Sequence, residues 1–234
     1  MRQGNAFNKE NIMRNKTPYL VEEKHHPDTI LPSKPAFNPK DRLIVIGSST
    51  GGTEALNTIF SKLPRGLPPI IVVQHIPKTF SASLVQRLDA NSALDVYEVT
   101  EKMVLQDSAV YVAAGDCHVL VGSEAGKCIV KPFEERRISR HKPSVDILFR
   151  SANNLSGPNT LAIILTGMGD DGSIGMKELF DNGAYTIAQD EKSCVVFGMP
   201  KKAIEAGAVR EVLPLEKIPA RIVELSSKKS FSCR

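Results

Sequence analysis

Apolar runs alternate with amphipathic stretches along most of the chain. Four apolar runs rich in β-branched residues predict buried strands: RLIVIG, PPIIVVQH, TLAIILTG and AYTIAQD. Between them, apolar residues recur every three to four positions, as in the predicted helix that carries Ala55, Leu56, Ile59, Phe60 and Leu63 on one face. Because strands alternate with helices, the pattern predicts an α/β fold, with a doubly wound, mostly parallel sheet and helices on both faces.

Shorter β-like pieces occupy the middle of the chain: LDVYEV, SAVYVAA, HVLVG and KCIVK. Turn residues separate the last three pieces, so we expect a small antiparallel hairpin insertion there. The stretch PSVDILFRSANNL then predicts a helix with Pro143 in its first turn.

The two ends of the chain lack this periodic pattern. Residues 1–40 carry five prolines, many charges and no sustained apolar period, which predicts a flexible or extended leader or linker. The periodic part, residues 41–226, is long enough for one α/β domain with a substantial core. Residues 227–234 are expected to form a tail.

Composition and charge exclude several classes of protein. No apolar run approaches the ~20 residues of a membrane-spanning helix, and the first residues lack the apolar core of a signal peptide. The net charge of +4 is mild, and an aromatic content of 6% without tryptophan offers no base-stacking platform. The four cysteines show no CxxC spacing, so they predict neither a metal site nor a disulfide. We therefore expect a cytoplasmic protein with no direct membrane insertion and no nucleic-acid partner.

Chemically capable residues follow three of the predicted strands. The loop GSSTGG follows the first, His75 the second, and TGMGDDG the strand that begins near residue 160. Because parallel strands end at one edge of a sheet, a hydroxyl, an imidazole and a carboxylate are expected there together. These are the three parts of an activated serine nucleophile. The pattern G-x-S-x-G, which begins at Gly47, places Ser49 at its centre.

Each of these residues also has a simpler interpretation. Ser48 and Ser49 could cap the next helix, and His75 could be a structural histidine. Asp170 and Asp171 could cap a helix or hold a magnesium ion. A phosphate cradle is a further alternative, but GSSTGG lacks the P-loop lysine and no acid ends the second strand, so nucleotide binding is the weaker hypothesis. The convergence of all three pieces on one edge favours catalysis, and the order Ser…His…Asp differs from that of α/β-hydrolases.

Five blocks of the sequence together resemble a known family: IGSSTGGTEAL, VVQHIP, RHKPSVDILFRS, ILTGMGDDG and DEKSCVVFGMPKKAIEAGAV. They are similar to the catalytic domain of the chemotaxis receptor methylesterases, the CheB family, from about Arg42 to about Val223. The resemblance implies hydrolysis of glutamate γ-methyl esters on the cytoplasmic helices of chemoreceptors, without metal or cofactor. It also implies deamidation of certain receptor glutamines as an additional activity of some members.

The resemblance assigns roles within the three pieces. Ser49, directly before Thr-Gly-Gly, matches the nucleophile rather than Ser48. His75 matches the general base. Asp171, directly before the glycine of GMGDDG, matches the orienting acid, and Asp170 receives no chemical role.

The same resemblance implies further residues around the site. The backbone amide of Met168 matches the oxyanion donor, and Thr50 and His141 match residues that line the site. The basic run Arg136-Arg137-Arg140-His141-Lys142 is a candidate contact for Glu-rich receptor helices, or else a solvated basic loop.

The chain departs from the family pattern in its N-terminal segment. Typical members carry a phosphorylatable receiver domain before the esterase, and forty polar residues are too few for one. The receiver domain is therefore expected to be missing or to lie on another chain. The alternative function is a non-catalytic, receptor-binding adaptor of the same fold, and the presence of all three triad residues argues against it.

Overall fold

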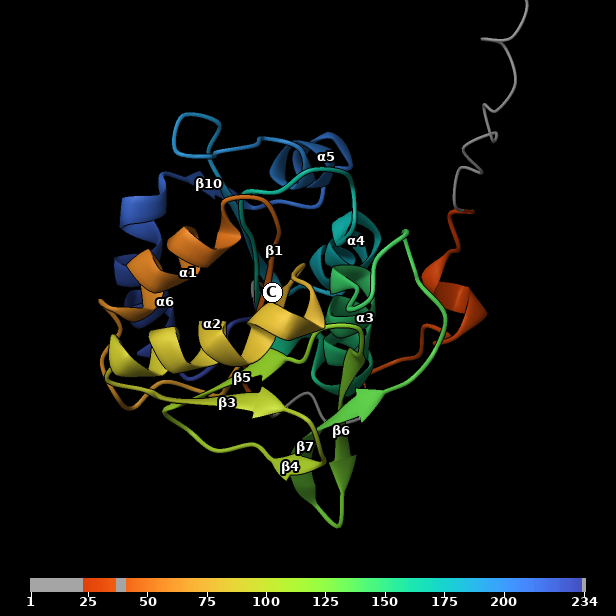
Figure 1. Cartoon of the computed structure of the whole chain (residues 1–234), viewed down its shortest axis with the longest axis horizontal. Coiled ribbons are helices and arrows are strands. Elements are labelled where there is room, and N and C mark those ends of the chain that lie inside the picture. The colour runs from red at the N-terminus through yellow and green to blue at the C-terminus, as the bar shows by residue number, and fades with distance from the viewer. Residues whose placement is uncertain (1–22, 37–40, 233–234) are drawn as a thin grey trace, which may run out of the picture.

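A seven-stranded sheet forms the centre of the computed structural model, which describes residues 23–36 and 41–232 (Figure 1). The strand order is β10-β9-β8-β1-β2-β5-β3, and every pair of neighbours is parallel. The strands are β1 (Leu43–Ser48), β2 (Ile70–Gln74), β3 (Asp95–Val99), β5 (Ala109–Ala113), β8 (Thr160–Ile164), β9 (Tyr185–Gln189) and β10 (Glu211–Leu213).

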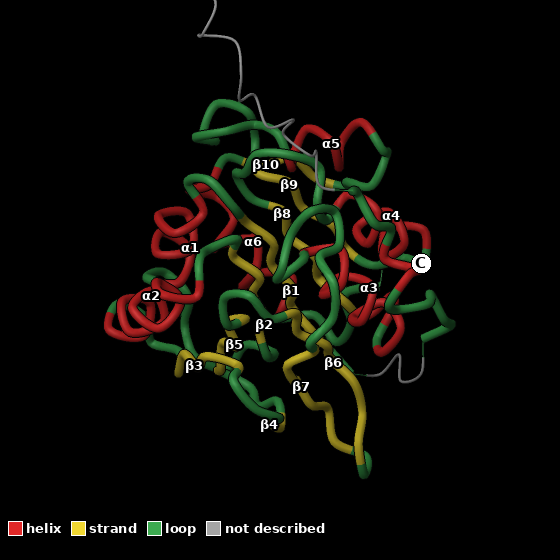
Figure 2. The backbone as a smooth tube through the Cα atoms, turned by 45° about the vertical axis from the view of Figure 1, so that its right-hand side comes forward, coloured by secondary structure: helices red, strands yellow, loops and turns green. Residues whose placement is uncertain are grey.

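Helices cover both faces of this sheet (Figure 2). One face carries α1 (Gly52–Phe60), α2 (Lys78–Ala90) and α6 (Ile218–Ser226), and the other carries α3 (Val145–Leu155), α4 (Ser173–Asp181) and α5 (Met199–Glu205). Alternate residues of the central strands enter two separate cores. In β1, Ile44 and Ile46 pack toward α1, whereas Leu43 and Val45 pack toward α3. This arrangement confirms the predicted doubly wound α/β fold.

A small antiparallel sheet extends from one side of the domain. It consists of β4 (Met103–Val104), β7 (Lys127–Phe133) and β6 (His118–Glu124), in that order. The predicted hairpin is present in β6 and β7, but the third expected member, β5, lies in the main parallel sheet. All five residues of β5 are buried, because it sits between β2 and β3 with both faces covered.

Both ends of the described chain are attached to the domain. Residues 23–36, part of the predicted leader, run along the outside of α3 and include a 3₁₀ turn, η1 (Pro27–Thr29) (Figure 1). In the predicted tail, Phe231 is buried, and the centre of its ring lies 4.6 Å from the guanidinium carbon of Arg42. Two further 3₁₀ turns are η2 (Gly157–Asn159) and η3 (Leu215–Lys217). The domain boundaries near residues 41 and 226 remain predictions, because contacts cross both of them.

Among the described residues, none of the helices is long and apolar enough to cross a membrane.

Candidate active site

The carboxyl ends of β1, β2 and β8 meet at one edge of the sheet, as the sequence predicts. Backbone hydrogen bonds continue past the strands and hold the three following loops in register. The Ser49 amide donates to the Thr166 carbonyl at 3.0 Å, and the His75 amide donates to the Ser48 carbonyl at 3.0 Å. The loop after β1 therefore lies between the other two.

The two serines of the first loop have different surroundings. Ser48 is fully buried, and its hydroxyl donates to Oε1 of Gln74 at 2.7 Å. Ser49 is half-buried, and its hydroxyl makes no hydrogen bond within the described part of the chain. The side-chain amide of Gln74 donates to the Ser49 carbonyl at 2.9 Å and so fixes the backbone of the loop. The hydroxyl available for chemistry is that of Ser49.

The turn into α1 requires glycine. Gly51 caps the helix with φ at 83°, in the left-handed region that residues with a side chain rarely adopt. A Cβ there would also lie 2.6 Å from Cβ of Val195. The Gly52 amide donates to the Ser49 carbonyl at 2.7 Å, whereas the first-turn amides of Thr53 and Glu54 have no acceptor within the described residues.

His75 and Asp171 form a buried hydrogen-bonded pair. Nε2 of His75 lies 2.8 Å from Oδ2 of Asp171. The other ring nitrogen, Nδ1, is buried without a hydrogen-bond partner among the described residues. Since Nε2 donates to the carboxylate, Nδ1 carries the lone pair. The imidazole therefore presents Nδ1 as its basic atom.

Asp171 is held as a carboxylate by donors from α3. It is fully buried, and it accepts hydrogen bonds from the Ser144 hydroxyl at 2.8 Å, the Val145 amide at 2.7 Å and the Asp146 amide at 3.1 Å. Burial raises its pKa, but the hydrogen bonds from His75 and from the helix amides outweigh burial and leave the pKa below its ordinary value. Asp171 therefore caps α3 and orients His75 at the same time.

A second buried acid, Asp146, caps the neighbouring helix in return. Its Oδ1 accepts from the amides of Ile174 and Gly175 in the first turn of α4, and its Oδ2 accepts from the Ser139 hydroxyl at 2.9 Å. Burial, together with the charge of Asp171, raises the pKa of Asp146 well above its ordinary value. The surroundings therefore favour the charged form of Asp171 and disfavour that of Asp146.

A buried histidine outside the predicted set supports the same network. Nδ1 of His118, on β6, accepts from the Ser144 amide at 3.1 Å, and its Nε2 donates to the Arg136 carbonyl at 2.9 Å. Burial lowers the pKa of His118, which favours the neutral ring with this one tautomer. His118 therefore links the basic loop to Ser144, and Ser144 in turn contacts Asp171.

His141 lies against His75. Its ring stacks on His75 with centroids 3.8 Å apart and planes 6° from parallel. Burial lowers the pKa of His141, and the nearby His75 lowers it further, so the ring stays neutral near pH 7. The predicted site-lining residue His141 thus packs against the ring of His75.

The predicted oxyanion donor is on a backbone fixed from both sides. Gly167 donates to the Val196 carbonyl at 3.0 Å, and its own carbonyl accepts from the amides of Gly198 and Met199. The following amide, that of Met168, has no acceptor within the described part of the chain.

The carbonyl of the exposed residue Thr50 accepts from the Thr166 hydroxyl at 2.9 Å.

Exposed apolar and basic side chains surround this edge of the sheet. Met168, Val195 and Phe80 are 72%, 69% and 58% exposed, and they follow β8, β9 and β2, which are parallel strands of the main sheet. A groove of about 430 Å³ lies beside Ile76 and Phe80. The basic residues Arg136, Arg137 and Arg140 are exposed on the loop before His141.

Over the described ranges, no group of three or more His, Cys, Asp or Glu side chains has a metal-binding arrangement. The paired acids Asp170 and Asp171 do not converge, since Asp170 pairs with Lys24 at the surface whereas Asp171 is buried against α3. The magnesium alternative therefore has no ligand set in this loop.

Sequence comparison relates this chain to known enzymes. A family model described as CheB methylesterase matches residues 44–222. Protein-glutamate methylesterase/protein-glutamine glutaminase 1 from Geobacter metallireducens is 46% identical over 203 residues, which cover 86% of this chain and 56% of that protein. The Shewanella denitrificans protein of the same name, numbered 2, is 42% identical over 224 residues, which cover 95% of this chain and 64% of that protein. The chain thus spans somewhat more than half the length of these relatives.

Structural comparison gives a closely related architecture. The crystal structure of the Thermotoga maritima CheB methylesterase catalytic domain matches with a TM-score of 0.77 and 41% sequence identity. The match covers 79% of this chain and 98% of that chain. The two folds therefore agree over nearly the whole of that catalytic domain.

Proposed function

The chain belongs to the CheB methylesterase family, and from that premise we propose that it is a serine hydrolase that removes methyl groups from glutamate γ-methyl esters of chemoreceptors. The observation that carries the proposal is the His75–Asp171 pair, with Nδ1 unpartnered at the edge where the Ser49 hydroxyl is also unpartnered. Deamidation of receptor glutamines is the companion activity, in keeping with the names of the relatives.

The proposed reaction proceeds in two halves. Nδ1 of His75 takes the proton of the Ser49 hydroxyl as its oxygen attacks the ester carbonyl. The Met168 amide and the first-turn amides of α1 stabilise the oxyanion. The imidazolium returns its proton to the departing methoxide, which leaves as methanol. Water, activated by the same nitrogen, then hydrolyses the acyl-enzyme to free glutamate.

Asp171 supplies orientation and charge in this scheme. Its hydrogen bond to Nε2 fixes the tautomer that leaves Nδ1 basic, and its negative charge stabilises the imidazolium. His141 shields one face of the ring from water. No step of the scheme uses a metal ion or a cofactor.

The surroundings of the site support a helical, acidic substrate segment. The apolar side chains of Phe80, Met168 and Val195 offer contact area, and the basic loop offers charge opposite to that of a Glu-rich helix. We therefore propose the methylated cytoplasmic helices of chemoreceptors as the partner and the cytoplasm as the place of action.

Methanol release from methylated receptor membranes tests the proposal. The full chain should release methanol, and Ser49→Ala should release none above background. A protein that binds these membranes but releases no methanol would be the adaptor of the same fold instead. Retention of ATP or NAD through purification would revive the nucleotide-binding alternative.

A further inference from the structure

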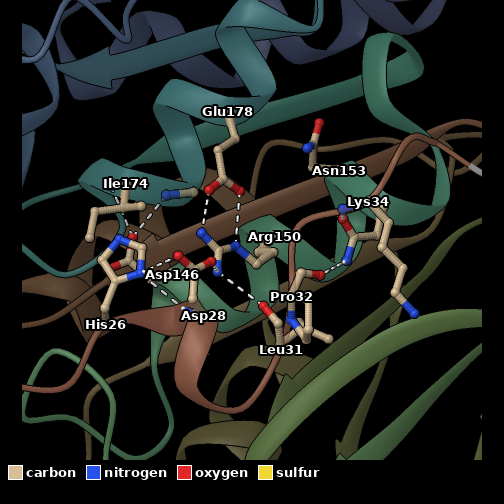
Figure 3. A network of polar contacts seen from close by, with 12 residues as sticks. His26, Asp28, Leu31, Pro32, Lys34, Asp146, Arg150, Asn153, Ile174 and Glu178 are labelled. Atoms are coloured by element: carbon tan, nitrogen blue, oxygen red, sulfur yellow. Dashed lines mark hydrogen bonds and ion pairs between the residues drawn. The ribbon is translucent and has the colours of Figure 1, made fainter.

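A single buried cation joins three segments beside the site (Figure 3). Arg150, on α3, is 1% exposed. Its guanidinium donates twice to Glu178 of α4, once to Oδ1 of Asp28 at 2.5 Å, and once to the Leu31 carbonyl at 3.0 Å. Arg150 therefore ties residues 28–31 to both helices that hold the triad acid.

The same N-terminal segment is fixed at the far end of α3. The Lys34 backbone amide donates to Oδ1 of Asn154 at 2.8 Å, and the side-chain amide of Asn154 donates to the Pro32 carbonyl at 3.0 Å. This pair of hydrogen bonds sets the direction of the segment along the helix.

The near end of the segment reaches the loops around the triad acid. Lys24 forms an ion pair with Asp170, the residue directly before Asp171. The carbonyl of His25 accepts from the Ser139 amide at 3.1 Å, and the Ser139 hydroxyl donates to Asp146. We call residues 24–34 the strap.

The position of the Asp171 carboxylate depends on how the two helices that the strap joins, α3 and α4, are placed relative to each other. Its carboxylate is held by the first turn of α3, but its backbone belongs to the loop that enters α4. A small shift of one helix against the other would therefore lengthen the His75–Asp171 hydrogen bond. A misplacement of about 1 Å can lower a catalytic rate about 10²-fold, so a smaller shift should lower it by a smaller, measurable factor.

We propose that the strap positions Asp171, with Lys24, Asp28 and Arg150 as positioning residues for the reaction proposed above. The inference rests on that proposed function, and it goes beyond it by assigning a role in turnover to a segment outside the fold's periodic part. None of the three side chains touches the reacting atoms. Their effect passes through the α3–α4 pair to Asp171.

Substitutions at the exposed end of each contact test the proposal in the full chain. Lys24→Gln and Asp28→Asn should each lower kcat by about two- to fivefold, the range expected for partly exposed ion pairs, and leave KM unchanged. The conservative variants Lys24→Arg and Asp28→Glu should restore most of the rate. Lys34→Gln is the matched control, because the Lys34 ammonium has no ion pair within the described residues, and it should leave kcat unchanged.

Two further measurements separate the alternatives. If the variants lower only the unfolding temperature and keep kcat at 25 °C, the strap is a stabilising element and the proposal is wrong. If they raise KM alone, the strap belongs to the substrate surface and the proposal is equally wrong. The rate at which a fluorophosphonate probe labels Ser49 reports activation of the nucleophile without any receptor. A wild-type chain that labels but releases no methanol would contradict the proposed substrate, while the labelling rates would still decide the role of the strap.

Discussion

The two adjacent serines of the loop after β1 differ in what their hydroxyls contact. Ser48 donates to Gln74 inside the protein, whereas the Ser49 hydroxyl makes no hydrogen bond within the described residues. We expect Ser49→Ala to lower methanol release by at least ~10³-fold, because it removes the proposed nucleophile. Ser48→Ala should keep substantial activity, with some loss of stability from the unpaired glutamine. An inactive Ser48→Ala beside an active Ser49→Ala would shift the nucleophile by one residue.

The buried acids predict opposite dependences of stability on pH. The pKa of Asp146 is raised, so between its ordinary value near 3.8 and its folded value the folded chain binds the extra proton. Stability should therefore fall as pH rises through that window. Asp146→Asn keeps acceptors for the α4 amides and should remove this decline. The free energy of unfolding in urea, measured from pH 4 to pH 8, checks it.

Asp171→Asn is the matched control for that experiment. The pKa of Asp171 is lowered in the fold, so its contribution is present above its ordinary value near 3.8 and is lost as pH falls through the folded value. Asp171→Asn should therefore lose stability at neutral pH, where Asp146→Asn should gain it. Two curves that change in the same direction would contradict the opposite pKa shifts of the two acids.

At the scale of single residues, the sequence predicts functional residues that belong to a contiguous motif. It misses residues that come into contact only in the folded chain. Ser49, His75 and Asp171 each follow a recognisable strand, so their placement at one edge of the sheet follows from sheet topology. Ser144, Asp146 and His118 carry no such local sign. An acid in the first turn of a helix reads as an ordinary favourable charge, and only the packing of α3 against α4 turns Asp146 into the cap of another helix.

Helices α3 and α4 cap each other, and a glycine lets them approach closely enough to do so. A Cβ on Gly175 would lie 2.7 Å from Cβ of Phe149 and 2.9 Å from the Asp146 carbonyl oxygen. Gly175→Ala should push the helices apart, lower the free energy of unfolding by about 1–3 kcal/mol, and reduce kcat. Chemical denaturation and methanol release measure the two effects.

Gly122→Ala provides the comparison, since a Cβ at Gly122 meets nothing within 4 Å. That variant should change neither stability nor rate appreciably. Equal effects of the two substitutions would mean that the close approach of α3 and α4 does not hold the site.

The elements themselves were predictable wherever their burial is uniform. The strands β1, β2, β8 and β9 are apolar runs covered on both faces, and the helices between them have one apolar face. The apolar run of β5 has the same local pattern as a hairpin strand, because the pattern of apolar residues cannot show which sheet a short strand joins. Its place between β2 and β3 depends on long-range pairing, which the local pattern does not encode.

At the scale of the whole molecule, segments without periodic pattern are still attached to the fold. The strap uses single polar residues and backbone carbonyls on a buried arginine, and Phe231 anchors the end of the chain by one buried ring. Such isolated contacts leave no repeat in the sequence, so composition alone predicts a free leader and tail. The receiver domain expected from the family resemblance remains a prediction about a longer protein or a second chain.

The charge around the site predicts how salt affects substrate binding. Arg136 and Arg140 are exposed on the loop that leads to His141, and a Glu-rich substrate helix would be attracted to them. Exposed charges are screened within about 8 Å at 0.15 M ionic strength, so raising the salt concentration from 50 to 300 mM should raise KM several-fold and leave kcat unchanged. The double variant Arg136→Gln/Arg140→Gln should raise KM at low salt and remove most of the salt dependence. Lys131→Gln, on β7 of the small sheet, is the control of equal charge type and should behave like the wild type. A salt effect that persists in the double variant would place the acidic helix on another surface.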